Sequence, residues 1–140
     1  MTNKLMVSFR REFATARVHF RVGEFDAAFY RLERAHILGQ RFFVPHMRTH
    51  WWMLQVGMIR GDIKEIVGQL FRLLAVIPGY LFGWVPIGNT GGADVSAIRP
   101  MPIPEDLSPR LAHYDIRSAV AERLRAWILI GLLLVLAVSH

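Results

Sequence analysis

Apolar residues recur every three or four positions through the first half of the chain, and this spacing predicts helices. The first predicted helix covers residues 3–21, with apolar positions at Leu5, Phe9, Phe13, Ala16 and Phe20. Three more helices are predicted over residues 25–38, 45–60 and 63–77. In the second helix, the residues expected to face inward are Ala28, Leu32 and Ala35.

Residues that stop or start helices lie at the predicted boundaries. Gly23, Gly39 and Gly61 follow the first three helices, where glycine tolerates the backbone of a helix terminus. Asp62 is a suitable N-cap for the fourth helix, and Pro78-Gly79 is expected to end it. The chain therefore begins with four helices joined by short turns.

The four helices form two pairs with similar sequence patterns. Aligning Gly23 with Gly61 places Phe25 on Ile63, as expected for a duplicated helical hairpin. The pattern resembles tetratricopeptide helix pairs, although the offset is longer than the about 34 residues of that repeat. The sequence thus predicts an all-α fold with two antiparallel, tetratricopeptide-like hairpins over residues 1–79.

Residues 80–110 predict an ordered strap rather than a helix. All but one of the chain's prolines lie between residues 78 and 109, and Gly91-Gly92 adds a glycine pair. Proline and glycine disfavour regular helix. Few of these residues are charged, whereas a mobile linker would be more polar, so we expect the strap to pack on the helices.

The last segment, residues 111–140, predicts one helix with a charged first half and an apolar second half. No charged residue follows Arg125, and the sequence from Trp127 onward is almost entirely apolar. Arg117, Arg123 and Arg125 precede this tail, and Trp127 begins it, as expected at a membrane interface. The tail would form about 20 Å of helix, less than a full span needs. We expect a membrane tail, and burial in a homo-oligomer is the alternative.

The composition favours a membrane over a nucleic acid as the partner. Hydrophobic residues make up 53% of the chain, and the formal net charge is +6, carried mostly by arginine. Basic charge suits nucleic acid or anionic lipid, but the sequence has no nucleic-acid-binding motif. There is no cysteine, which excludes disulfides and thiolate metal sites. The N-terminus lacks the apolar core of a signal peptide, so we expect the chain on the cytoplasmic side.

Three of the six histidines lie close to the predicted turn between the second and third helices. Glu33 and His36 are three positions apart, and His46 and His50 are four apart, so each pair shares one helix face. Antiparallel packing would bring all four side chains to one end of the hairpin. Imidazole and carboxylate bind transition metals such as zinc or iron. The sequence therefore predicts a metal site, with Glu12 as a further candidate ligand.

Other interpretations of these polar residues stay open. The histidines could stabilise helix ends through hydrogen bonds alone, without a metal. In the strap, Asn89-Thr90-Gly91-Gly92 resembles a glycine loop that binds anions, but it lacks the Gly-Lys-Ser/Thr ending of a phosphate loop. We interpret these four residues as a rigid turn, with a binding loop as the alternative.

Three long strings of sequence carry a resemblance to a known family. They are Leu32-Glu33-Arg34-Ala35-His36-Ile37-Leu38-Gly39-Gln40, Pro45-His46-Met47-Arg48-Thr49-His50-Trp51-Trp52-Met53-Leu54, and Gly88-Asn89-Thr90-Gly91-Gly92 through Pro104. Together they resemble a small bacterial family catalogued only as a domain of unknown function. The resemblance covers about residues 9–107 and implies a bacterial source, but no activity. The tail after Leu111 lies outside the shared region.

Two functions follow from these patterns. The first is a non-catalytic helical binding protein, tail-anchored at the cytoplasmic face of the inner membrane as a subunit or assembly factor of a membrane complex. The second is a metal-binding protein, either a carrier or a metal-dependent enzyme, with Glu33, His36, His46 and His50 as ligands. In the enzyme, Glu12 would be the nearest candidate base.

Overall fold

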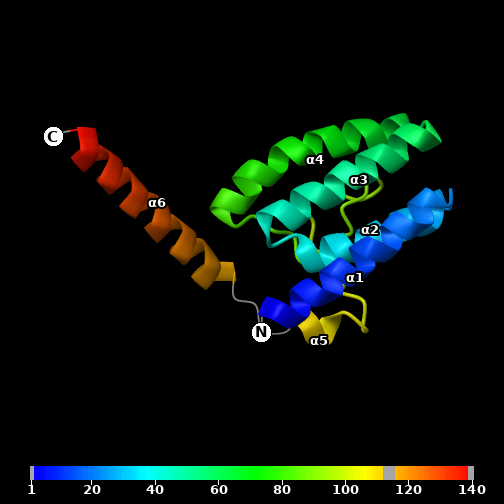
Figure 1. The fold of residues 1–140 in the computed structure, drawn as a ribbon, viewed down its shortest axis with the longest axis horizontal. Helices are drawn as coiled ribbons and strands as arrows, with labels where there is room; N and C mark the ends of the chain where they lie inside the picture. The colour runs from blue at the N-terminus through cyan, green and yellow to red at the C-terminus, as the bar shows by residue number, and fades with distance from the viewer. Residues whose placement is uncertain (1, 112–115, 139–140) are drawn as a thin grey trace.

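The computed structural model describes residues 2–111 and 116–138, and α-helix accounts for most of them. The helices are α1 (Thr2–Arg21), α2 (Phe25–Gly39), α3 (Phe43–Arg60), α4 (Ile63–Phe82), α5 (Ser108–Leu111) and α6 (Ile116–Val138). The first four pack in chain order, α1 against α2, α2 against α3 and α3 against α4 (Figure 1). No strand occurs in the described ranges, so the all-α prediction is confirmed.

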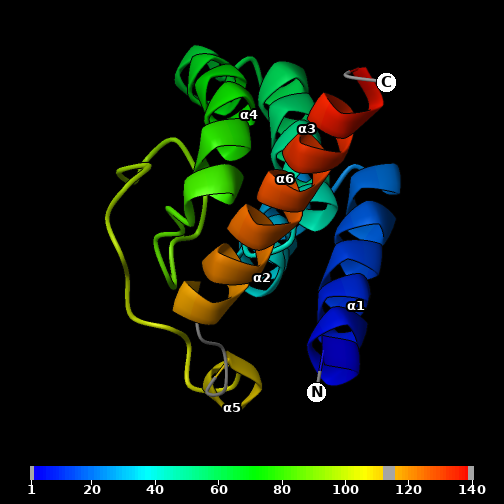
Figure 2. The ribbon, with the colours of Figure 1, turned by 90° about the vertical axis from the view of Figure 1, so that its left-hand side faces the viewer.

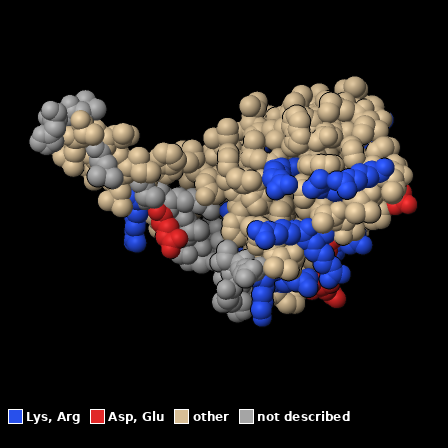
Figure 3. Space-filling model, viewed as in Figure 1, with Lys and Arg blue, Asp and Glu red and all other residues tan. Residues whose placement is uncertain are grey.

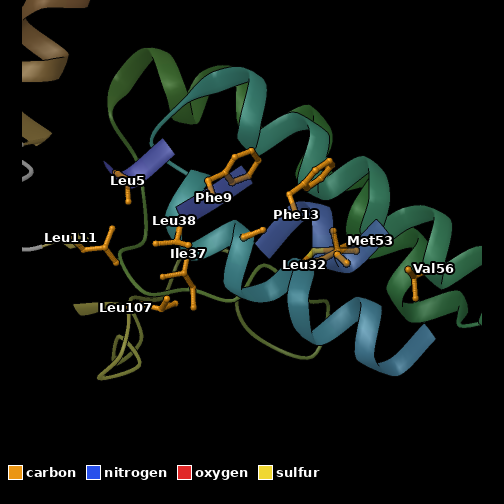
Figure 4. Close-up of a cluster of buried hydrophobic side chains, with 12 residues drawn as sticks. Leu5, Phe9, Phe13, Leu32, Ile37, Leu38, Met53, Val56, Leu107 and Leu111 are labelled. Carbon is orange, nitrogen blue, oxygen red and sulfur yellow. The ribbon is translucent and has the colours of Figure 1, made fainter. Parts of the chain in front are cut away.

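The hydrophobic core lies between α1, α2 and α3. Phe9 and Phe13 of α1 stack with ring centroids 5.5 Å apart. Leu32 of α2 and Met53 of α3 are fully buried in the same cluster, and Leu107 closes it from the end of the strap (Figure 4). Of the predicted inward positions of the second helix, Leu32 and Ala35 belong to this core, and Ala28 is also fully buried.

In the first four helices, every predicted end lies within two residues of the observed one except the end of α4. The last helix was predicted to start at residue 111, but α6 begins at Ile116 and Leu111 belongs to α5. α4 continues through Pro78 to Phe82 and ends at Gly83, whose φ is +70°. Pro78 cannot donate a hydrogen bond to the carbonyl of Leu74. Both residues lie on the exposed side of α4, where that carbonyl is not enclosed between helices. The predicted stop at Pro78 is therefore wrong.

The start of α4 follows the prediction. The Oδ1 atom of Asp62 accepts a hydrogen bond from the backbone N–H of Glu65 at 3.0 Å, which caps the helix.

The polarity of α4 is the reverse of that expected for a helix on the surface of a soluble domain. Its buried side carries Glu65, Gln69 and Arg72, and Val76 is the one apolar residue buried with them. Its exposed side carries an apolar stripe, here called the outer stripe: Ile63, Val67, Leu70, Phe71, Leu74 and Ile77. In Figure 3 the surface along the top of the molecule, over α4, is free of charged side chains.

The strap covers residues 83–107 in the structure and packs on the polar side of α4. Arg72 donates from Nη2 to the carbonyl oxygens of Gly92 and Val95, at 2.8 and 2.6 Å. From there the strap runs beside α4 and descends to α5 (Figure 2). An arginine on α4 therefore holds the strap through its backbone.

α6 leaves the body near the C-terminal end of α4 and projects away from the other helices (Figure 1). Arg125 and Trp127 are exposed, and so are most of the apolar side chains that follow. The side chains of Arg117 and Arg123 lie outside the described part of the structure. Among the described residues, α4 is the one helix that passes a length and composition test for crossing a membrane. Core helices of soluble proteins pass the same test.

Candidate metal centre

Three histidine side chains meet where α2, α3 and the strap come together. His36 lies in the last turn of α2, and His46 and His50 occupy successive turns at the start of α3. The Nε2 atom of His36 is 2.9 Å from that of His46 and 3.2 Å from that of His50, and the Nε2 atoms of His46 and His50 are 3.0 Å apart. The three rings therefore direct one nitrogen each at a common point.

A glycine at the turn allows this approach. A Cβ atom on Gly39 would lie 2.8 Å from the ring of Phe9 and 3.1 Å from the Cβ of Pro45. Because Gly39 has no side chain, the end of α2 packs closely against α1 and the first turn of α3. Gly39 thus brings His36 within reach of the two histidines on α3.

In two of the histidines, the ring nitrogen that points away from the centre, Nδ1, makes a hydrogen bond that determines the tautomer. The Nδ1 atom of His36 lies 2.8 Å from the carbonyl oxygen of Asn89, and the Nδ1 atom of His50 lies 2.6 Å from Oε1 of Gln69. Both oxygens can only accept, so each Nδ1 carries the proton and donates it. The Nε2 atoms of His36 and His50 then present lone pairs to the centre, as metal ligands do.

The Gln69 amide is itself held in one orientation. Its Nε2 atom donates to Oε1 of Glu65 at 2.6 Å and to the carbonyl oxygen of Gly91 at 2.8 Å. Both partners are acceptors, which leaves Oε1 of Gln69 to face His50. The polar side of α4 therefore positions a histidine of α3.

Burial keeps the three imidazoles neutral. It lowers the pKa of His36 to about 4, and it lowers the pKa of His46 and His50 well below the usual value. Repulsion between protonated rings lowers the pKa of His46 and His50 further. The Nε2 lone pairs of His36 and His50 face each other at 3.2 Å and repel, and a cation between the three rings would bind all of them. Nitrogens around a tetrahedral zinc ion lie about 3.3 Å apart, close to the separations found here.

The two predicted carboxylates lie elsewhere. Glu33 is one turn before His36, but its carboxylate is not part of the three-histidine group. Burial, followed by the charge of Asp94, raises the pKa of Glu33 to about 7. Glu12 accepts hydrogen bonds from Arg31 at 3.0 Å and from Arg34 at 3.1 Å. The structure thus places Glu12 in an ion-pair cluster between α1 and α2 and not beside the histidines.

The loop residues Asn89, Thr90, Gly91 and Gly92 lie against the histidines, and the turns of this part of the strap are on either side of them, at residues 87–88 and 93–94. Gly91 has a φ of +84°, and a Cβ atom there would lie 2.8 Å from the ring of His36. The Asn89 side chain is 1% exposed. Its Nδ2 donates to the carbonyl oxygens of Ser96 and Arg99, both at 2.8 Å. The side chain of Asn89 therefore holds the strap together while its backbone carbonyl binds His36.

Gln69 belongs to the candidate site but was not among the residues predicted for it. A signal was present, because Glu65, Gln69 and Arg72 are polar residues at helical spacing within a largely apolar helix. This spacing places the three residues on one side of α4. Which partner they would meet there depends on the strap, whose path the spacing does not reveal.

The region with these features matches one family. The family model described as "Protein of unknown function (DUF3703)" covers residues 3–111. The chain belongs to the DUF3703 family. The DUF3703 region includes the three histidines and the strap and ends before α6. The predicted membership of an uncharacterised family is confirmed, and no curated protein or solved structure matches the chain.

Proposed function

We propose that this protein binds a transition metal ion, such as zinc, through the Nε2 atoms of His36, His46 and His50. The observation that carries the proposal is the convergence on one point of three neutral imidazole nitrogens, from the buried His36 and His50 and the partly buried His46. The hydrogen bonds that Asn89 and Gln69 accept from two of the rings support it, since metal-binding histidines commonly have such partners.

A site made of three imidazoles limits which metal ions would bind and what they could do. Three imidazoles suit zinc, iron or copper better than magnesium or calcium, which prefer oxygen ligands. Three protein ligands also leave at least one coordination position for water or another molecule, as in catalytic zinc sites. Such a centre is suited to chemistry or to metal transfer rather than to holding the fold alone.

The test is metal analysis of the purified, zinc-loaded protein, with the double variant His46→Ala, His50→Ala beside the wild type. His19→Ala is the matched control, because His19 pairs with Glu24 at the far end of α1. We expect near-stoichiometric zinc in the wild type and in the control, and none in the double variant. Absence of zinc from the wild type, or equal zinc in all three proteins, would refute the proposal. Circular dichroism checks that the double variant is folded.

We propose membrane attachment as a second, separable property, in which the protein would serve as an accessory subunit or assembly factor at the cytoplasmic face of the inner membrane. Four consecutive residues of α6, Trp127 to Ile130, are each about half exposed or more, so the apolar surface surrounds that helix. A single protein groove cannot cover every side of a helix, whereas lipid can. The outer stripe of α4 adds a second apolar surface, and Arg125 suits anionic headgroups.

Flotation with vesicles containing phosphatidylglycerol tests this second proposal. We expect the full chain to float with the vesicles and a chain lacking residues 127–140 to stay at the bottom of the gradient. If both chains behave alike, the tail does not attach the protein to lipid. Light scattering distinguishes the alternative, because a tail that forms a homo-oligomer would make the full chain larger than the truncated one without vesicles.

A further inference from the structure

A cavity of about 120 Å³ lies between α4 and the strap and reaches the three histidines. Most of its wall is apolar, formed by Phe71, Ala75, Val76, Trp84, Ala97 and Ile98. The histidines at its inner end are largely buried, whereas Phe71, Trp84 and Ile98 are each more than half exposed. The cavity therefore leads from the exposed side of the molecule, beside the outer stripe, to the point where the three Nε2 atoms meet.

The few polar groups in the wall are occupied by the protein itself. Arg72 donates to the carbonyl oxygens of Gly68, Gly92 and Val95, and the Asn89 side chain is bonded within the strap. A molecule in the cavity would thus find little hydrogen bonding from the walls. The strongest interaction available to it would be with a metal ion on the histidines.

The charge around the centre favours an anionic donor atom. Three neutral imidazoles leave the charge of a divalent ion uncompensated. Arg72, which is 8% exposed, adds a positive charge in the same wall, and its hydrogen bonds go to carbonyl oxygens. The carboxylates of Glu65 and Asp94 are close enough to attract this charge, but neither of them lines the cavity. Buried charge is stable when it is paired, so a fourth ligand with negative charge would be bound more strongly than a neutral one.

We infer that the cavity binds a small ligand with an anionic donor head and a short apolar body, and that this ligand takes the fourth coordination position of the metal. The inference rests on the proposed metal site. The volume sets the size of the ligand, because an apolar protein cavity of about 150 Å³ accommodates benzene. A carboxylate with a chain of a few carbons has the required head, body and size.

Cobalt-loaded protein provides the test, since the visible absorption of Co²⁺ reports its coordination. Butyrate is the probe for the inferred ligand class, and azide is a probe with an anionic head but no apolar body. We expect both anions to change the cobalt spectrum of the wild type, with butyrate saturating at the lower concentration. A spectrum that responds to neither anion, or to azide alone, would overturn the inference while leaving the metal site intact.

A variant that fills the cavity sharpens the result. Ala75→Phe places a ring in the cavity, and Ala97→Phe does the same from the strap if the first variant does not fold. Ala14→Phe is the matched control, because Ala14 is exposed on α1 and does not line this cavity. We expect the filled variant to keep cobalt but lose at least tenfold in butyrate affinity, with no loss in the control. Equal butyrate affinity in all variants would refute the inference, and a wild type that binds no Co²⁺ would refute the metal site and the ligand together.

Discussion

α1 and α4 are the outer helices of the four-helix body, and they bury opposite kinds of residue. α1 turns apolar side chains inward, with Phe9 and Phe13 in the core. α4 turns Glu65, Gln69 and Arg72 inward and exposes the outer stripe. α1 therefore stabilises the fold by removing apolar surface from water, whereas the buried side of α4 supports the histidines and the strap through hydrogen bonds.

The largest expected effect comes from breaking the core against which α1 packs. Leu32→Ala removes a side chain that is 0% exposed, and we expect a loss of about 2–5 kcal/mol in the free energy of unfolding. Leu74→Ala makes the same change on the outer stripe, where the side chain is 73% exposed, and should cost less than about 0.5 kcal/mol. Denaturant unfolding of both variants measures the difference. Equal losses would mean that the outer stripe is buried in solution.

The next effect is a loss of stability in acid that originates at the histidines. The pKa of His36 is about 4 in the folded protein and 6.5 in its ordinary state, so below pH 6.5 the unfolded chain takes up a proton that the folded one excludes. The free energy of unfolding of the metal-free protein should therefore fall as the pH decreases from 6.5 toward 4, by about 3 kcal/mol for this residue alone. His46 and His50 shift in the same direction.

Burial of Glu33 has the opposite effect on the pH dependence of stability. Its pKa is raised to about 7, so between pH 7 and 4.5 the folded protein takes up a proton before the unfolded chain does. Glu33→Gln should consequently make the loss of stability in acid steeper. Denaturant midpoints between pH 8 and 4 measure both slopes. A free energy of unfolding of the wild type that does not change with pH would contradict the burial of the histidines. A pH dependence that is the same in Glu33→Gln as in the wild type would contradict the burial of Glu33.

A smaller effect is expected on the buried side of α4. Gln69→Leu keeps the size of the side chain but leaves groups of His50, Glu65 and Gly91 without partners, so we expect a loss of about 1–3 kcal/mol in stability. Zinc affinity, measured by competition with a chelator, should fall about 10–100-fold. Gln69→Glu, protonated on the oxygen that faces Glu65, retains the acceptor for His50 and should recover zinc affinity, although it loses the hydrogen bond to Gly91. Gln55→Leu on α3 is the control. Unchanged zinc affinity in Gln69→Leu would exclude a role in positioning His50.

The smallest effect on stability separates the exposed sides of the two helices. Val67→Gln on α4 and Val18→Gln on α1 replace valines that are 61% and 58% exposed, and each should change stability by less than about 0.5 kcal/mol. Vesicle binding should weaken for Val67→Gln only, because Val67 belongs to the outer stripe. Equal weakening in both variants would show that the outer stripe has no special affinity for lipid.

The same contrast explains how far the sequence could predict the structure. Helix positions depend on local spacing and capping, and for that reason the predicted ranges were close to those observed. The prediction that the fourth helix stops at Pro78 failed because a proline leaves the carbonyl four residues earlier without its helical hydrogen bond. Whether the helix can continue depends on whether other helices enclose that carbonyl, and this is a property of the packing.

The candidate site was predictable only in part, for a similar reason. The spacings of His46 and His50, with His36 across one short turn, brought three histidines together. Glu12 was predicted wrongly as a ligand because its position in the sequence indicates how far along α1 it lies but not which neighbour its side chain meets. That side chain accepts hydrogen bonds from Arg31 and Arg34. Gln69 depends on where the strap crosses α4, and no local pattern encodes that crossing.

The hydrogen bond between His36 and the Asn89 carbonyl has a consequence for biosynthesis. A ribosome makes all three histidines well before Asn89, which follows His36 by 53 positions. The nascent chain therefore has the histidines without the acceptor that sets the tautomer of His36. Under the proposed function, metal capture at full affinity must await the emergence of the strap, so we expect loading only after residues 83–107 have left the ribosome.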